Sequence, residues 1–165
     1  MSAGKFNLRE MILLALVGAM MMVTQVALSA LPNIHLVAVF VILAVQLFGW
    51  KSLLSVYIFV LLEGLIYGFS MWFVNYLYVW AVLAVVAMIF QNNRSRFFWA
   101  AVSGIFGLCF GALCAIPYLF IGGWTAAFSY WVSGIPFDLT HCVSNAVITF
   151  AVLDPLRRLC LKLLK

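Results

Sequence analysis

Residues 134–145 hold the side chains of this sequence that are best suited to chemistry. Asp138 is followed by His141 three residues later and by Asn145 seven residues later. At about 100° per residue in a helix, these offsets place the three side chains within roughly 60° of one another on one face. Pro136 suits the first turn of a helix, and a carboxylate is favoured there by the helix dipole. We therefore expect a helix that begins near Pro136 and carries a polar stripe.

This polar stripe has two interpretations. A buried network of hydrogen bonds that holds helices together uses the same residue types as a ligand site. Polar and ionisable groups inside an apolar membrane segment are unfavourable, and those present commonly mark functional sites. We therefore favour a ligand site over a purely structural network.

The elements that must position the stripe are almost entirely apolar. Hydrophobic residues make up 68% of the 165 residues and charged residues 8%, with a mean hydropathy of +1.22, whereas globular domains carry about 25% charged residues. This composition excludes a soluble domain. The basic residues form short clusters between apolar runs, which argues against nucleic acid as a partner. The sequence predicts an all-α membrane protein whose single domain covers residues 1–165.

Six apolar segments follow one another along the chain. Several reach the about 20 residues that span a hydrocarbon core, and Pro117 is expected to kink or end the fifth. Residues 11–31 exceed the core of about 7–15 residues found in signal peptides, so we expect a retained helix. The six predicted transmembrane helices cover residues 8–31, 33–49, 52–69, 72–91, 96–121 and 135–153.

Positive charges predict the orientation of this six-helix bundle. In a six-span topology all basic residues fall on one side, which is the cytoplasmic side by the positive-inside rule. Both termini are then cytoplasmic, and residues 31–35, 68–72 and 121–135 form outer loops. The basic residues are Lys5, Arg9, Lys51, Arg94, Arg96, Arg157, Arg158, Lys162 and Lys165.

Polar and aromatic residues gather toward the outer ends of these segments, where Gln25 and Ser29 also lie. This asymmetry predicts a cup that opens outward, although Trp and Tyr also form ordinary belts at membrane interfaces. Glu63 either contacts the ligand or pairs with His141 or a tyrosine hydroxyl. Aromatic faces with a few converging polar groups suit a flat heterocycle. The candidate substrate-binding residues are Asn33, His35, Glu63, Tyr67, Trp72, Asn75, Tyr76, Trp131, Asp138, His141 and Asn145.

Small residues recur at four-residue spacing in two segments. Ser103, Gly107, Gly111 and Ala115 form a stripe along the fifth segment, and we expect it to pack inside the bundle, since small residues let helices approach closely. In the first segment the small residues either pack internally or dock another membrane subunit. The candidate docking residues are Ala15, Gly18 and Ala19.

The sequence resembles the S-components of energy-coupling factor (ECF) transporters. The resemblance rests on the Ala15-x-x-x-Ala19 step, on the length and topology, and on residues 31–35, 63–68 and 134–141. It implies a substrate-capture subunit of a vitamin importer in the bacterial plasma membrane. Such a subunit associates with a membrane scaffold subunit and two cytoplasmic ATPases, and Ala15 and Ala19 would contact the scaffold. ATP and Mg²⁺ would bind those partners, because this chain has no Walker motif and needs no cofactor of its own.

The substrate is expected to be a small ring vitamin, with pyridoxine or hydroxymethylpyrimidine first and cobalamin or another corrinoid as the alternative. The predicted outer side carries no basic residue, which argues against anionic vitamins. A non-transporting membrane scaffold of the MreD type is a second class that fits the composition. No nucleophile motif accompanies His141 and no Cys/His metal spacing occurs, so we predict neither an enzyme nor a metal site.

Overall fold

The computed structural model describes residues 6–31 and 33–163, and their secondary structure is helical, with no strand among them. The predicted all-α class is therefore confirmed. A short 3₁₀ helix, η1, joins the second and third α-helices. The elements are α1 (Leu8–Ala27), α2 (Val37–Phe48), η1 (Gly49–Ser52), α3 (Leu53–Tyr67), α4 (Met71–Ile89), α5 (Arg96–Cys114) and α6 (Ile116–Leu163).

Five helical segments in the described part of the chain are long and apolar enough to cross a membrane. They are α1, the continuous stretch Val37–Tyr67, α4, α5 and α6. α2 has 12 residues, fewer than the about 20 that a span needs, and it runs directly into η1 and α3. By length and composition, α2 and α3 therefore count as one segment rather than as the two predicted.

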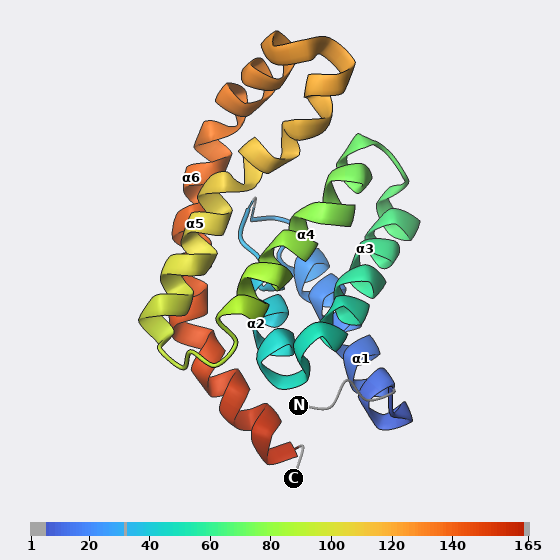
Figure 1. Cartoon of the computed structure of the whole chain (residues 1–165), viewed down its shortest axis with the longest axis vertical. Helices are drawn as coiled ribbons and strands as arrows, with labels where there is room; N and C mark the ends of the chain where they lie inside the picture. The colour runs from blue at the N-terminus through green and yellow to red at the C-terminus, as the bar shows by residue number, and fades with distance from the viewer. Residues whose placement is uncertain (1–5, 32, 164–165) are drawn as a thin grey trace.

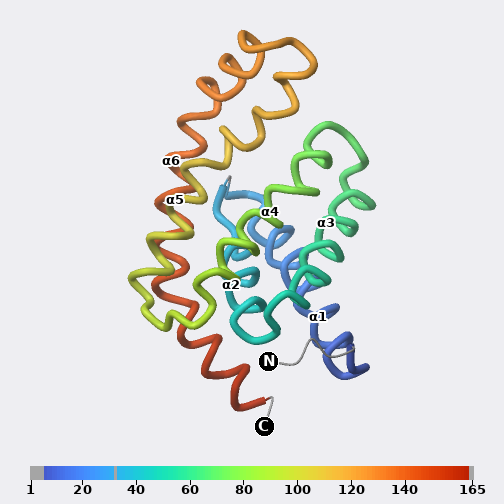
Figure 2. Tube along the Cα trace, in the orientation of Figure 1, coloured from blue at the N-terminus to red at the C-terminus, as the bar shows by residue number. Residues whose placement is uncertain are grey.

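The helices form a bundle of four beside a longer antiparallel pair (Figures 1 and 2). α2 packs mainly against α4, α6 and α1, while α5 and α6 run side by side and connect in a hairpin that projects beyond the other helices. The first turn of α1 and the last turn of α6 lie at the opposite end of the molecule from this hairpin. The molecule therefore has a termini end and a hairpin end.

α2 forms the centre of the core. Its residues 37–45 are all buried, as expected for a helix that is apolar on every side. Trp80 of α4 is also fully buried and lies edge-on to Phe59 of α3, with their ring centroids 6.0 Å apart. Large side chains thus fill the space around a short, uniformly apolar helix.

α5 and α6 approach closely along the predicted stripe of small residues, which confirms its internal packing. A Cβ atom on Gly107 would lie 2.7 Å from the His141 carbonyl oxygen, and one on Gly111 would overlap the Asp138 carboxylate. The Ser103 hydroxyl donates a hydrogen bond to Thr149 Oγ1 across the same interface at 2.7 Å. Glycines therefore fix the spacing of this helix pair, and polar side chains add specific contacts.

The predicted outer loop over residues 121–135 is wrong. The chain reverses at Gly122 and Gly123, where the backbone leaves helical geometry and Gly123 has φ +68°, and helix resumes directly after them. Residues 124–133 contain no Pro or Gly, so nothing stops the helix once the reversal is made. Pro136 consequently lies inside α6 instead of in a first turn.

The predicted helix ends also need correction. α5 ends at Cys114, seven residues before the predicted boundary at 121, and Pro117 lies in the first turn of the segment that follows. Proline fits a first turn because its missing N–H has no partner there. α1 ends at Ala27, four residues before the predicted boundary, and α6 continues to Leu163.

We predict that Gly107→Val lowers the thermal stability of the purified chain. The added methyl groups would force α5 away from α6, and such overpacking typically costs about 1–3 kcal/mol. Gly134→Ala is the control, since no atom lies within 4 Å of the added Cβ. Thermal unfolding in detergent measures both variants, and equal midpoints for Gly107→Val and the unsubstituted chain would contradict the close packing.

Candidate functional site

A polar cavity of about 290 Å³ lies among α1, α3, α4, α5 and α6, beside the segment that joins α1 to α2. This segment follows the end of α1 that is remote from the chain termini (Figure 1). The cavity combines hydrogen-bonding groups with aromatic and aliphatic walls, as small-molecule sites commonly do. Its lining residues are Gln25, Leu28, Ser29, Leu31, Asn33, Ile34, His35, Tyr67, Tyr76, Phe110 and His141.

Five of the predicted substrate-binding residues line this cavity: Asn33, His35, Tyr67, Tyr76 and His141. The candidate set omitted Gln25 and Ser29, although two polar residues four apart at the end of an apolar helix are a usable signal. It also omitted Phe110 and the aliphatic residues, which nothing in the sequence distinguishes from ordinary core.

Two imidazole rings form one wall of the cavity. The rings of His35 and His141 lie edge to face, with centroids 4.7 Å apart. The ring of Phe110 packs against His141 with the centroids 4.8 Å apart, and the ring of Trp80 packs against His35 with the centroids 5.6 Å apart. These aromatic contacts hold both imidazoles in fixed orientations.

Several polar atoms around the cavity are buried without a hydrogen-bond partner in the described part of the chain. They include Gln25 Oε1, His35 Nδ1 and His141 Nε2. Buried polar groups are normally paired, and each exception requires an explanation such as a ligand or a water molecule. Burial also lowers the pKa of His35 to about 4, so this imidazole is neutral at physiological pH.

The polar stripe of α6 is divided between two roles. Asp138, His141 and Asn145 are all buried on the face toward α5, as their spacing predicts. Asp138 Oδ1 accepts a hydrogen bond from the backbone N–H of Gly111 at 2.9 Å, and Asn145 Nδ2 donates one to the carbonyl oxygen of Ser103 at 3.3 Å. His141 lines the cavity, whereas Asp138 and Asn145 belong to the α5–α6 interface. Asp138 and Asn145 thus each bond to α5 through one atom, whereas Asp138 Oδ2 and Asn145 Oδ1 have no partner among the described residues.

Glu63, Trp72 and Asn75 lie outside the cavity lining. Glu63 is 3% exposed, and its Oε1 atom has no hydrogen-bond partner among the described residues. That atom therefore pairs neither with His141 nor with a tyrosine hydroxyl, the two predicted partners. Trp72 packs edge-on against Tyr76, with centroids 5.3 Å apart, so it supports a lining residue. Asn75 Oδ1 accepts a hydrogen bond from the Tyr78 hydroxyl at 3.3 Å.

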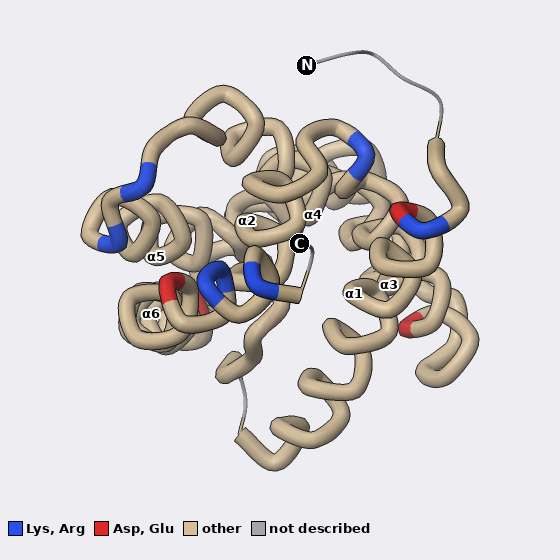
Figure 3. Tube along the Cα trace, turned by 90° about the horizontal axis from the view of Figure 1, so that it is seen from below, with Lys and Arg blue, Asp and Glu red and all other residues tan. Residues whose placement is uncertain are grey.

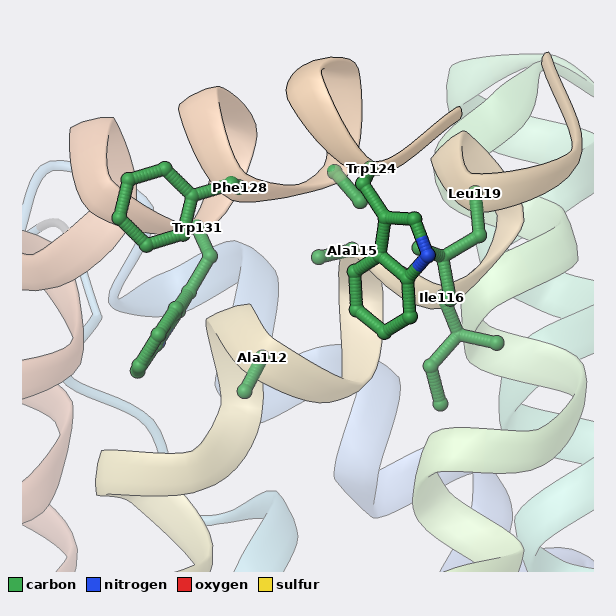
Figure 4. Close-up of a pocket in the computed structure, with 8 residues that line it drawn as sticks. Ala112, Ala115, Ile116, Leu119, Trp124, Phe128 and Trp131 are labelled. Carbon is green, nitrogen blue, oxygen red and sulfur yellow. The ribbon is translucent and has the colours of Figure 1, made fainter. Parts of the chain in front are cut away.

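Trp131 belongs to a separate, apolar pocket of about 200 Å³ within the α5–α6 hairpin (Figure 4). Trp124 and Phe128 line the same pocket, and Trp124 is 82% exposed. The pocket contains no polar group able to orient a ligand except the indole N–H groups. Trp131 is thus separated from the polar cavity that the sequence placed it beside.

The three candidate docking residues differ in exposure. Gly18 is buried against α3, since a Cβ there would lie 2.8 Å from the Ser55 carbonyl oxygen. Ala15 and Ala19 are partly exposed and share a face of α1 with the exposed side chains of Ile12 and Leu16. Gly18 therefore packs α1 inside the bundle, whereas the two alanines lie on an outer apolar face.

The basic residues of the described chain gather at the termini end of the molecule. The view toward the termini end shows its Lys and Arg residues (Figure 3). Two acidic residues of this end are paired: Glu10 with Lys51 and Asp154 with Arg157, each at 2.6 Å. No Asp, Glu, Lys or Arg side chain from the described residues lines the polar cavity.

We predict that the folded chain loses stability as the pH falls from 6.5 to about 4. The pKa of His35 is about 4 in the folded chain, compared with 6.5 for an unperturbed histidine, which represents the unfolded chain. Between these two values the unfolded chain therefore binds a proton that the folded chain does not. The contribution is complete above pH 6.5 and is lost progressively toward pH 4. Thermal unfolding across this range should show a shallower pH dependence for His35→Gln. Identical slopes would contradict the buried, neutral imidazole.

The chain matches no family model, no curated protein and no solved structure. The feature of the described residues best suited to a ligand is the polar cavity, which has unpaired buried atoms and an uncharged lining.

Proposed function

We propose that this protein is the substrate-binding membrane subunit of an ECF-type vitamin importer in a bacterial plasma membrane. The observation that carries the proposal is the cavity of about 290 Å³, whose wall contains buried imidazole and amide atoms without partners. A purely structural protein, such as a scaffold of the MreD type, has no need for such a cavity. A capture subunit needs one.

The size and lining of the cavity favour a small, uncharged ring vitamin. Small-molecule sites span about 300–1,000 Å³, and this cavity is at the lower limit. Pyridoxine or hydroxymethylpyrimidine suits that volume better than a corrinoid macrocycle. An anionic vitamin would be desolvated next to uncharged groups, with no cation to compensate it.

We further propose six membrane passes with both termini in the cytoplasm. α2 and α3 run in opposite directions on either side of η1 (Figure 1), which supports counting them as separate passes. Lys51 lies at their turn, at the same end as the other described basic residues. The positive-inside rule then makes the termini end cytoplasmic, and the polar cavity faces outward.

In this proposal the chain has no catalytic role and binds no cofactor. A scaffold subunit would contact the outer face of α1 through Ala15 and Ala19, because small side chains allow a partner helix to approach closely. Two ATPase subunits bound to that scaffold would bind ATP and Mg²⁺ and supply the energy. The exposed apolar side chains that flank the two alanines support a contact of this kind.

We predict that the double variant Ala15→Trp, Ala19→Trp loses its partner subunits and vitamin uptake but still binds the vitamin. The indole rings would block close approach at the outer face of α1 and leave the cavity unchanged. The measurement is affinity purification from the native membrane followed by mass spectrometry, which should find an ATPase pair and an apolar scaffold with the unsubstituted chain.

Ala101→Trp is the matched control, because Ala101 is exposed on α5, away from α1. This control should retain the complex. Recovery of the same ATPase complex with the double variant would overturn the docking assignment. Absence of any ATPase from the unsubstituted chain would overturn the proposed function.

A further inference from the structure

We propose that Gln25, His35 and His141 form a three-point site that selects an uncharged, single-ring heterocycle bearing hydrogen-bond donors. This inference rests on the proposed function and narrows its substrate class. The three residues come from α1, from the segment between α1 and α2, and from α6. Each presents a buried polar atom that no described residue satisfies.

The chemistry of these three atoms defines what the ligand must offer. Gln25 Oε1 is a hydrogen-bond acceptor and requires a donor, while a neutral imidazole nitrogen either donates or accepts according to its tautomer. Hydroxyl, hydroxymethyl and amino groups at separate positions of the ligand ring would satisfy these atoms. A carboxylate or phosphate offers no donor to Gln25 and would remain without a counter-charge.

Aromatic neighbours position the two imidazoles before any ligand arrives. Phe110 and Trp80 hold the imidazoles from behind, and Phe106 lies 6.5 Å from His141. Fixed donors and acceptors reduce the entropy lost on binding. The volume of about 290 Å³ suits a single-ring ligand and is small for a macrocycle.

A ligand held at these three points would also connect α1 to α6. α1 packs against α3 and α2 inside the bundle, and the cavity separates the end of α1 from His141. Occupancy of the cavity would therefore restrain the end of α1 that carries Gln25. The same helix bears the outer face formed around Ala15 and Ala19.

Binding to the full chain in lipid nanodiscs tests the proposal. The probes are pyridoxine and 4-amino-5-hydroxymethyl-2-methylpyrimidine as uncharged rings, with pyridoxine 5′-phosphate and nicotinate as anionic counterparts. At least one uncharged probe should bind, and its anionic counterparts should bind at least tenfold more weakly. Hydrogen exchange should slow at residues 22–28 when the uncharged probe is bound.

Three variants remove one polar site each. His35→Phe and His141→Phe keep an aromatic ring, and Gln25→Met keeps the side-chain length. Each should weaken binding about tenfold, as expected for the loss of one hydrogen bond. Tyr57→Phe is the control, because it removes a polar atom from an exposed ring of α3 outside the cavity, and it should bind normally.

Unchanged affinity in all three variants, or equal binding of the phosphate ester, would overturn this inference. The comparison of uncharged and anionic probes uses the unsubstituted chain, so it remains decisive if a variant does not fold. If no uncharged probe binds but the ATPase complex co-purifies, the inference fails while the proposed function stands. If an uncharged probe binds as expected without any ATPase partner, the three-point site stands and the importer role fails.

Discussion

The close contact between α5 and α6 is the interaction on which the rest of the structure depends. Gly107 and Gly111 bring the two helix backbones together, and the bond from the Gly111 N–H to Asp138 Oδ1 sets their relative position along the axis. Because His141 lies one turn from Asp138 on the same face, this register determines where its imidazole points. The contact with Phe110 of α5 then holds that ring against the cavity. A helix interface thus positions the imidazole that lines the cavity.

Polar groups in the interior of this apolar bundle are only partly paired. In an apolar bundle, a buried polar atom without a partner is destabilising. At the α5–α6 interface, hydroxyl, amide and carboxylate groups bond across the helices, as Ser103 and Thr149 do, while Asp138 Oδ2 and Asn145 Oδ1 have no partner among the described residues. Around the cavity, amide and imidazole atoms remain unpaired. Such atoms reduce stability in the free protein, and a complementary ligand would recover that loss by binding.

Much of the fold follows from local sequence signals, whereas the division of roles within the site does not. Hydrophobic runs predicted the helical class, and the spacing of Asp138, His141 and Asn145 predicted their shared face. Periodicity cannot tell which of these residues meets a backbone group of α5 and which meets a cavity, since that depends on tertiary register. Residues 121–135 were predicted as a loop, although most of them are helical. The sequence does not separate the two, because aromatic residues near a membrane interface occur in loops and in helices. Gly122 and Gly123 were the available signal for the reversal.

An outward-facing cavity requires that the cavity and the basic residues face opposite sides of the membrane. Single cysteines placed at exposed Ser70 and Asn92, in a chain whose four native cysteines are replaced by alanine, report it directly. A membrane-impermeant maleimide applied to intact cells should label Ser70→Cys at once and Asn92→Cys only after permeabilisation. Labelling of both positions from the same side, or in the reverse order, would contradict an outward-facing binding cavity.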